Sequence, residues 1–177
     1  METEEQLLSA IRSGDESAFR RLYERYSRYA IAIGLRYIPE QNEVNDVLQD
    51  SFIKILTSLD QFNYRGEGSL KNWIGRIVAH QAIDHIRHRE RVSFVSINTD
   101  DVVDEDSDIW EMPSEILTRM IGRLPANYRV VLNLYVFERL THYEIAQLLG
   151  IKEKTSSSLF FRAKQLLKKM ANDYLNE

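Results

Sequence analysis

Apolar residues recur at helical spacing along the first part of the chain. Residues 4–38 carry two such stripes, which Gly14-Asp15 separates and Pro39 ends. Glycine followed by aspartate breaks a helical pattern, and proline cannot continue the backbone hydrogen-bond ladder. The pattern therefore predicts two consecutive amphipathic helices before residue 39.

A stronger amphipathic pattern follows over residues 42–59. Its predicted core positions are Val44, Val47, Leu48, Phe52, Ile55, Leu56 and Leu59. The opposite face carries Asp46, Gln49, Asp50 and Lys54. Asn42 is a suitable N-cap, and Glu43 favours the positive end of the helix dipole. We expect one helix with a buried face and a polar face.

Residues 60–68 contain two glycines and are predicted to form a loop. Ser69 is the expected cap of a helix that runs to about Arg89. Its predicted core-facing residues are Trp73, Ile77, Ile83 and Ile86.

The C-terminal third predicts at least three helices. Two span about 114–123 and 126–138, and a last long one spans about 153–173. Between them, Thr141 and Glu144 have the spacing of a capping box, and Gly150 stands where a left-handed residue ends a helix. A capped helix, a glycine turn and a basic second helix are typical of a helix-turn-helix unit.

Composition supports an all-α fold of two small helical domains. Glycine (7) and proline (3) are scarce, and 44% of the 177 residues are apolar. The chain has no cysteine, no glycine-rich phosphate loop and no apolar stretch of about 20 residues that could span a bilayer. We therefore expect a cytoplasmic protein with no membrane insertion and no cofactor.

Charge is distributed unevenly beneath a net charge of −4. The segments 70–91 and 152–169 are basic, whereas residues 92–115 hold eight acids and no Lys or Arg. Local charge matters more for binding than the whole-chain sum. We predict domains at 1–91 and 114–177, joined by an acidic flexible linker at 92–113.

The second helix of a helix-turn-helix unit lies in the DNA major groove. Its exposed early residues are predicted to be Lys154, Thr155, Ser157, Ser158, Phe161 and Arg162. Lys164, Lys168 and Lys169 could reach phosphates, which gives affinity without sequence information. An ordinary helical hairpin with a solvated basic face remains the alternative on spacing alone.

A metal site is the main enzymatic alternative. His80, His85 and His88 lie near Asp84, but Asp84 and His85 are adjacent and face different sides of a helix. No independent third ligand accompanies them, and no Ser/His/Asp arrangement can be defended. We predict neither a metal site nor catalytic residues, so the protein is not expected to be an enzyme.

Two sets of motifs resemble one known family, the bacterial RNA polymerase sigma factors of the extracytoplasmic-function (ECF) branch. The C-terminal set comprises Leu124-Pro125, Tyr128-Arg129, Val131-Leu132, Leu140-Thr141, Glu144-Ile145-Ala146, Leu149-Gly150-Ile151, Thr155 and Arg162-Ala163. The N-terminal set comprises Phe19, Leu22-Tyr23, Asp46-Val47-Leu48-Gln49-Asp50, Phe52, Trp73-Ile74, Ile77, Ile83-Asp84 and Ile86-Arg87. They resemble the family's regions 4 and 2, respectively.

The resemblance implies a subunit that joins core RNA polymerase, directs it to promoters and assists DNA melting. It implies docking on the clamp helices of the β′ subunit through Asp46, Gln49, Asp50 and Phe52. It implies contacts to the −10 element from Asn63, Tyr64, Arg65, Lys71, Arg76, His80 and Arg87. It implies contacts to the −35 element from Lys154, Thr155, Ser157, Ser158, Phe161 and Arg162, with the β flap and an anti-sigma factor as further partners.

Physical chemistry fits these implied roles. A base released from the duplex can stack on an aromatic ring for about 1–3 kcal/mol, and Tyr64 is the expected platform, with Asn63 and Arg65 as polar partners. Phe62 and Trp73 are expected in the core. Arg76, Arg87, Arg89 and Arg91 would hold phosphates.

Four positions depart from the family pattern. His80 replaces a usual asparagine, Asn45 a usual acid, and Ser157 and Leu159 stand where basic residues are frequent. Fewer cations imply a shallower salt dependence of DNA binding.

A one-component regulator, with a sensing domain before the helix-turn-helix unit, is the second alternative. Such a sensor needs a ligand pocket or a phosphoacceptor on an α/β scaffold. The first domain is instead predicted to be helical, with its own basic helix and aromatic loop.

Overall fold

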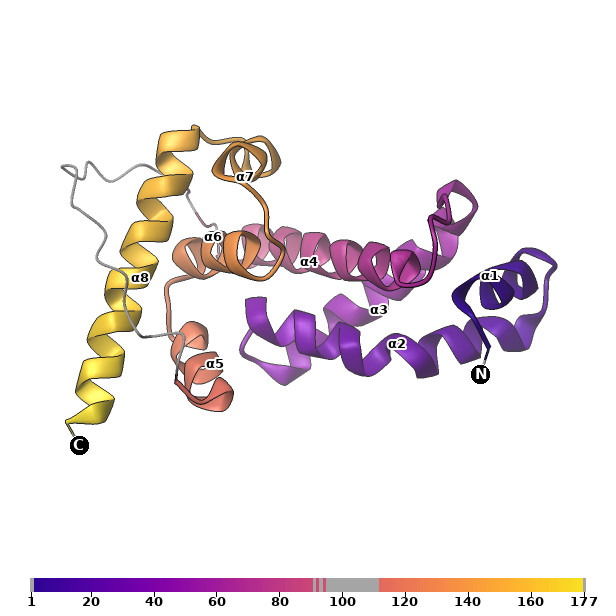
Figure 1. The fold of residues 1–177 in the computed structure, drawn as a ribbon, viewed down its shortest axis with the longest axis horizontal. Coiled ribbons are helices and arrows are strands. Elements are labelled where there is room, and N and C mark those ends of the chain that lie inside the picture. Colours follow the sequence, from indigo (N-terminus) through magenta and orange to yellow (C-terminus); the bar gives the residue numbers. More distant parts are fainter. Residues whose placement is uncertain (1, 91, 93, 95–111, 177) are drawn as a thin grey trace. The chain divides into compact units, whose positions relative to one another are not determined.

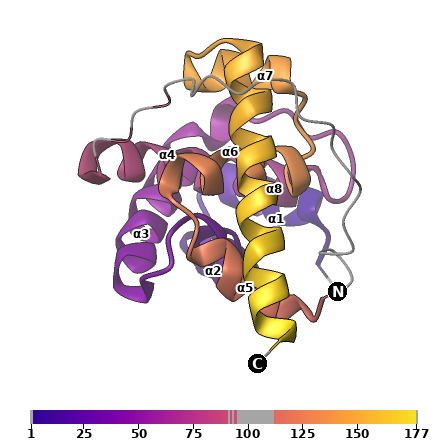
Figure 2. The ribbon, with the colours of Figure 1, turned by 90° about the vertical axis from the view of Figure 1, so that its left-hand side faces the viewer.

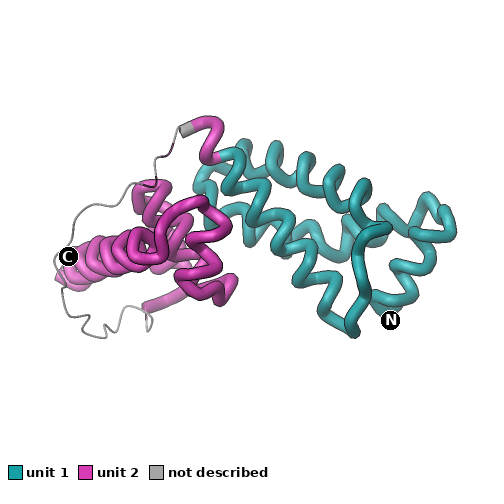
Figure 3. Tube along the Cα trace, turned by 90° about the horizontal axis from the view of Figure 1, so that it is seen from above, with its two compact units in different colours: residues 1–85 teal, residues 86–177 magenta. Residues whose placement is uncertain are grey.

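The computed structural model describes residues 2–90, 92, 94 and 112–176, and within them the chain is all-α (Figure 1). These residues form eight α-helices and one short 3-10 helix, with no strand. The chain divides into two compact units, residues 1–85 and 86–177 (Figure 3). The predicted fold class is confirmed. Most of the predicted linker, including its acidic residues, lies outside the described residues.

The first unit begins with three α-helices in sequence. They are α1 (Glu4–Arg12), α2 (Glu16–Tyr37) and α3 (Gln41–Ser58), followed by the 3-10 helix η1 (Leu59–Gln61) and α4 (Ser69–Glu90), which extends past the division between units. Thr3 caps α1 through a capping box, and the Asp15 side chain caps α2. The expected cap at Asn42 is wrong, because α3 begins one residue before it, at Gln41.

The core of the first unit lies among α1, α2, α3 and α4. On α4 the buried apolar residues of this unit include Leu70, Ile74, Val78, Ala82 and Ile83. Trp73 and Ile77, expected in the core, are only half-buried. Apolar residues occupy two adjacent stripes of α4, so periodicity alone did not determine which stripe faces α2.

Close packing of α2 against α3 depends on a glycine. A Cβ atom added to Gly34 would lie 2.8 Å from Cγ1 of Val44, which is fully buried. Real Cβ atoms do not approach other carbons this closely, so the missing side chain allows the two helices to approach.

The second unit is built around its last helix. It contains α5 (Ser114–Gly122), α6 (Ala126–Val136), α7 (His142–Leu149) and α8 (Glu153–Leu175). Figure 2 shows α8 running along the unit, with α5 and α7 near its two ends. Leu124, Leu132, Ala163 and Leu167 are central in its buried cluster. The buried Arg129 donates to the carbonyl oxygens of Gly122 and Leu124, which satisfies acceptors at the end of α5.

Gly34→Ala should destabilise the first unit. Alanine favours helix over glycine by about 1 kcal/mol, but overpacking a core costs about 1–3 kcal/mol. We expect urea unfolding followed by circular dichroism to show a net loss of about 1 kcal/mol. The double variant with Val44→Ala should be more stable than the sum of the single effects predicts, because truncation of Val44 makes room for the methyl group. Strict additivity would contradict the proposed steric contact.

Candidate functional site

The loop between η1 and α4 is held by side chains of α1. Arg12 donates from Nη2 to the carbonyl oxygen of Phe62, at 2.7 Å. Glu4, only 2% exposed, accepts from the backbone N–H groups of Gly68 (2.9 Å), Leu70 (3.0 Å) and Lys71 (3.1 Å). The Glu4 carboxylate therefore caps the N-terminus of α4, where the helix dipole is positive, although Glu4 itself belongs to α1.

Ser69 does not cap α4, contrary to the sequence prediction. It is the first helical residue, and its own N–H donates to the carbonyl oxygen of Gly66 at 3.1 Å. The Ser69 hydroxyl also donates to Gly66 O and accepts from the Arg65 N–H. Serine therefore tightens the preceding turn while Glu4 supplies the cap.

Glu67 connects this loop to α1 and α2. One carboxylate oxygen accepts from the Glu4 N–H at 3.1 Å and from the Tyr64 hydroxyl at 3.4 Å. The other oxygen pairs with Arg25 Nη2 at 3.0 Å. Desolvation and the nearby Glu67 carboxylate raise the pKa of Tyr64, so its phenol is protonated and can donate.

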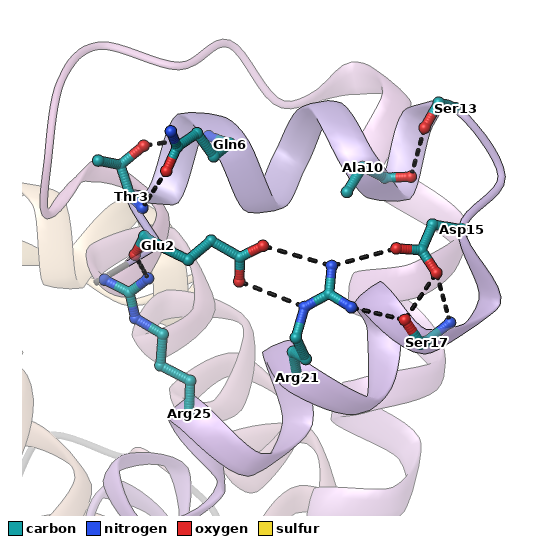
Figure 4. Close-up of polar contacts among 9 residues, drawn as sticks. All are labelled: Glu2, Thr3, Gln6, Ala10, Ser13, Asp15, Ser17, Arg21 and Arg25. Carbon is teal, nitrogen blue, oxygen red and sulfur yellow. Dashed lines mark hydrogen bonds and ion pairs between the residues drawn. The ribbon is translucent and has the colours of Figure 1, made fainter.

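The chain before α1 is fastened to α2 by a polar network (Figure 4). Arg21 bridges the carboxylates of Glu2, at 3.3 Å, and Asp15, at 3.2 Å. Arg25 donates to the carbonyl oxygen of Glu2, at 2.9 Å. The hydrogen bonds from Ser17 and Arg21 lower the pKa of Asp15, so this carboxylate is ionised at neutral pH.

A hollow of about 360 Å³ opens beside the same loop. It is lined by Gln61, Phe62, Asn63, Arg65, Ser69, Asn72, Trp73 and Arg76. The structure thus brings together three of the predicted −10 residues: Asn63, Arg65 and Arg76. Tyr64 is not among the lining residues. Trp73, assigned to the core by periodicity, lies against Phe62 with ring centroids 4.9 Å apart and forms part of the wall.

The remaining predicted −10 residues lie along α4. Lys71 is exposed, with Nζ 4.8 Å from the Tyr29 ring centroid. Partial desolvation lowers the pKa of His80 against the opposing effect of Asp84, so His80 is neutral at pH 7. Arg87 is half-buried. Arg91 lies outside the described residues.

The histidines of α4 do not form a metal cluster. His85 instead lies 3.1 Å from a carboxylate oxygen of Glu43 on α3. Across the part of the chain that the structure describes, no group of three or more His, Asp or Glu residues could hold a metal ion.

One face of α3 combines charge with exposed apolar residues. Asp46, Gln49 and Asp50 are exposed as predicted. Phe52 is buried, with its ring centroid 4.7 Å from that of Tyr23.

A second hollow, of about 510 Å³, borders this face. It is lined by Phe19, Tyr23, Ile31, Asn45, Leu48, Gln49, Phe52, Ile53 and Leu56. Leu56, assigned to the core, is 49% exposed, and Ile53 is 56% exposed. Ile53 is apolar but stands outside the helical stripe, a signal that could have identified this surface.

The second unit contains the predicted helix-turn-helix geometry in α7 and α8. The Thr141 hydroxyl accepts from the Glu144 N–H, and the Glu144 carboxylate accepts from the Thr141 N–H at 2.8 Å. Gly150 has φ 68°, the left-handed conformation that ends α7. The capping box and the glycine turn are confirmed.

The predicted DNA-facing residues of α8 differ in exposure. Lys154 and Ser157 are exposed, and Ser158, Phe161 and Arg162 are half-buried. Thr155 is only 5% exposed, so its predicted exposure is wrong. The reason is that the first turns of α8 pack against α7, which also buries Leu159.

An aromatic cluster not predicted from the sequence joins α6, α7 and α8. The Tyr135 ring stacks on His142, with centroids 4.5 Å apart, and lies 4.4 Å from the Phe160 centroid. His142 Nδ1 is also 2.9 Å from the Ser156 hydroxyl. Partial burial lowers the pKa of His142, although Glu153 opposes the shift. A neutral histidine therefore helps to fix the angle between α7 and α8.

These features define a helical protein with a capped loop and hollow in its first unit and a helix-turn-helix in its second. The model of sigma-70 region 2 matches residues 22–92, and the model of sigma-70 region 4 matches residues 114–167. The chain belongs to the sigma-70 family of RNA polymerase sigma factors, in the ECF branch. Members of this family are transcription initiation factors rather than enzymes.

Curated relatives match along nearly their whole length. The RNA polymerase sigma-H factor of Pseudomonas aeruginosa is 28% identical, over 99% of this chain and 97% of the relative. The ECF RNA polymerase sigma-E factor of Haemophilus influenzae is 27% identical, over 93% of each chain.

Two solved structures have a similar fold. CnrH, in complex with the cytosolic domain of CnrY, has a TM-score of 0.50 and 25% identity over 94% of this chain and 96% of CnrH. RpoE of Bartonella quintana, in complex with the anti-sigma factor NepR, has a TM-score of 0.55 and 18% identity over 87% of this chain and 96% of RpoE. None of the described helices is long and apolar enough to cross a membrane.

The stability of the second unit should fall as the pH falls below about 6.5, the pKa of an unfolded histidine. Folding lowers the pKa of His142, so the unfolded state binds more protons in this range. The contribution is fully present above the unfolded pKa and is lost as the pH drops toward the folded value. Protection factors for amide exchange in α7, which compare each amide with its intrinsic rate at the same pH, should fall between about pH 7.5 and about 5.5.

His142→Gln should remove this part of the pH dependence, since glutamine keeps a polar side chain that does not titrate. His88→Gln, at an exposed position of α4, is the matched control. An unchanged pH profile in the His142 variant would contradict the assignment.

Proposed function

We propose that this protein is an alternative sigma factor that recruits core RNA polymerase to promoters through the −10 and −35 elements and assists DNA melting. The observation that carries the proposal is the hollow beside the capped loop, with cationic, amide and aromatic walls, in a unit of the sigma-70 region 2 family. Run-off transcription with core polymerase and a promoter library would test it. A one-component regulator is not favoured, because the first unit belongs to a sigma-factor region.

The two units would divide the work. Residues 1–91 would bind the polymerase and the −10 element, and residues 114–177 would bind the −35 element and the β flap. Residues 92–113 would connect them. The acidity of this segment suits passage through a basic channel of the polymerase. A simple soluble tether is the alternative role, because it would have the same composition.

The α3 face is the proposed docking surface for the β′ clamp helices. Asp46, Gln49 and Asp50 offer acceptors for basic partner side chains. Ile53 and Leu56, beside the larger hollow, offer exposed apolar contact area. Protein–protein interfaces combine an apolar centre with a polar rim, so we add Ile53 and Leu56 to the predicted docking residues. We assign the buried Phe52 to the floor of the hollow.

The smaller hollow is the proposed site for a base that has left the duplex. Its wall contains Trp73, against which a base could stack, and Asn63, whose amide can pair with base edges. Arg65 and Arg76 would hold the flanking phosphates. Tyr64, hydrogen-bonded to Glu67 outside the hollow, would then support the loop rather than provide its stacking surface.

On α8, Lys154 and Ser157 are the exposed candidates for major-groove contacts, together with the half-buried Ser158, Phe161 and Arg162. Lys168 and Lys169 are exposed and could contact phosphates further along the helix.

An anti-sigma factor is the proposed regulator. RpoE of Bartonella quintana was solved in complex with one, and CnrH in complex with the cytosolic domain of CnrY. A regulator that covered the α3 face would mask the proposed polymerase-docking surface, including Ile53 and Leu56.

Reversing the charges of Asp46 and Asp50 to lysine should weaken binding to core polymerase. We expect a loss of about tenfold in affinity, about 1.4 kcal/mol, because exposed pairs contribute little individually and like charges repel. The loss should shrink at high salt, because ions screen exposed charges. Fluorescence anisotropy with labelled protein provides the measurement.

The matched control reverses Glu5 and Glu24, two exposed acids on α1 and α2. Equal losses in both double variants would mean that total charge, not the α3 face, determines binding.

Asn63→Ala should slow promoter opening while leaving core binding unchanged. Losing a good base contact costs about 1–3 kcal/mol, so we expect at least about fivefold weaker binding to single-stranded −10 DNA in the holoenzyme. Asn172→Ala, exposed on α8, is the control. Wild-type affinity of the Asn63 variant for this strand would contradict the assignment of the hollow.

A further inference from the structure

We infer that α1 is a positioning element for the loop at residues 62–68, with Glu4 and Arg12 as its two positioning residues. The inference rests on the proposed function, because it assigns α1 a part in promoter opening. Neither residue lines the hollow itself.

The two residues hold the loop at its two ends. Arg12, near the end of α1, donates to the carbonyl oxygen of Phe62, where the loop begins. Glu4, at the start of α1, accepts from the N–H of Gly68, where the loop ends. One rigid helix therefore fixes the distance between the two ends of the segment.

The Glu4 carboxylate is suited to this task because its hydrogen-bond partners are all donors. Oε2 accepts from Gly68 N and Leu70 N, and Oε1 accepts from Lys71 N and from the Tyr26 hydroxyl at 2.8 Å. Burial, and after it the Glu4 carboxylate, raise the pKa of Tyr26, so the hydroxyl keeps its proton. A buried acceptor with four donors forms charge-assisted bonds that no neutral side chain of the same shape can replace.

The backbone of Glu4 extends the control to the middle of the loop. Its N–H donates to Glu67, and the same Glu67 oxygen accepts from the Tyr64 hydroxyl. The position and orientation of α1 therefore help to determine where Tyr64 lies beside the hollow.

Such support matters because the loop is intrinsically adaptable. Gly66 and Gly68 have φ 111° and 90°, in the region that favours glycine. A loop that had to become ordered during base capture would lose conformational entropy at that step. Holding it in advance makes capture faster, which is the benefit of preorganisation.

The α1 helix is itself fixed, as a positioning element must be. Glu2, just before it, pairs with Arg21 and offers its carbonyl oxygen to Arg25, both on α2 (Figure 4). Leu7 and Leu8 are buried in the core. Displacing the loop without displacing α1 therefore requires breaking the Glu4 and Arg12 contacts.

The test compares Glu4→Gln with Glu5→Gln in holoenzyme assembled from the full chain and core polymerase. Glu5 is the exposed neighbour on the same helix and loses the same charge. The amide introduced by Glu4→Gln would turn its own donors toward two of the existing donors. We expect faster hydrogen exchange at the amides of Gly68, Leu70 and Lys71, and about tenfold slower opening of a 2-aminopurine-labelled promoter, the size expected when bonds to a buried charged group are lost.

Core affinity should stay within about twofold of wild type, since the α3 face is unchanged. Arg12→Ala, at an exposed position, removes the other end of the support without creating a buried defect, and it should also slow opening. The defect of both variants relative to wild type should be smaller on a premelted promoter bubble than on a duplex, because melting is already complete.

Wild-type opening rates in the Glu4 and Arg12 variants, despite faster exchange, would overturn the inference. A parallel loss of core affinity and opening in both variants would also overturn it, because it would indicate general unfolding. If the wild-type chain failed to join core polymerase, the proposed function would fail, whereas the exchange result would separately decide whether α1 holds the loop.

Discussion

The N-terminus of α4 depends on one buried carboxylate, and the candidate site depends on α4. The first N–H groups of a helix lack partners within the helix, and leaving them buried without acceptors is costly. Here Gly66 O accepts from Ser69, and Glu4 accepts from Leu70 and Lys71. Because this acceptor comes from α1, the end of α4, the loop and the docking of α1 are coupled through the same carboxylate.

Two kinds of surface result from this arrangement in the first unit. The hollow beside the loop is walled by polar and aromatic groups, including Asn63, Arg65 and Trp73, whereas the hollow beside α3 is walled mainly by apolar side chains such as Ile53 and Leu56. Unstacked nucleobases need ring faces and hydrogen-bond groups, and a partner helix needs apolar area with charges at its rim. The chemistry of each surface thus matches a different proposed partner.

Sequence patterns predicted features encoded by neighbouring residues and missed contacts between residues far apart in the chain. The Thr141–Glu144 box and Gly150 are encoded within a few residues, and both were predictable. Glu4 looked like one acid in an acidic terminus, because the backbone N–H groups that it caps lie 64 to 67 residues away. Trp73 was misplaced because α4 carries two neighbouring apolar stripes, and Thr155 because packing against α7 is not visible in its spacing. The resemblance named Asn63, Arg65 and Arg76, which line one hollow, but the sequence did not show how the loop beside them is supported.

DNA binding by the second unit is also expected to depend on contacts made elsewhere in the proposed complex. Aromatic contacts among Tyr135, His142 and Phe160 help to fix its helix-turn-helix. Residues 155–161 of α8 include no Lys or Arg, and DNA affinity follows the number of neutralised phosphates. Such a unit would bind DNA weakly alone. On a polymerase that also holds the first unit, the second contact becomes intramolecular, and its effective concentration compensates for the small charge. Promoter selectivity in the proposed complex therefore belongs to the assembly rather than to either unit.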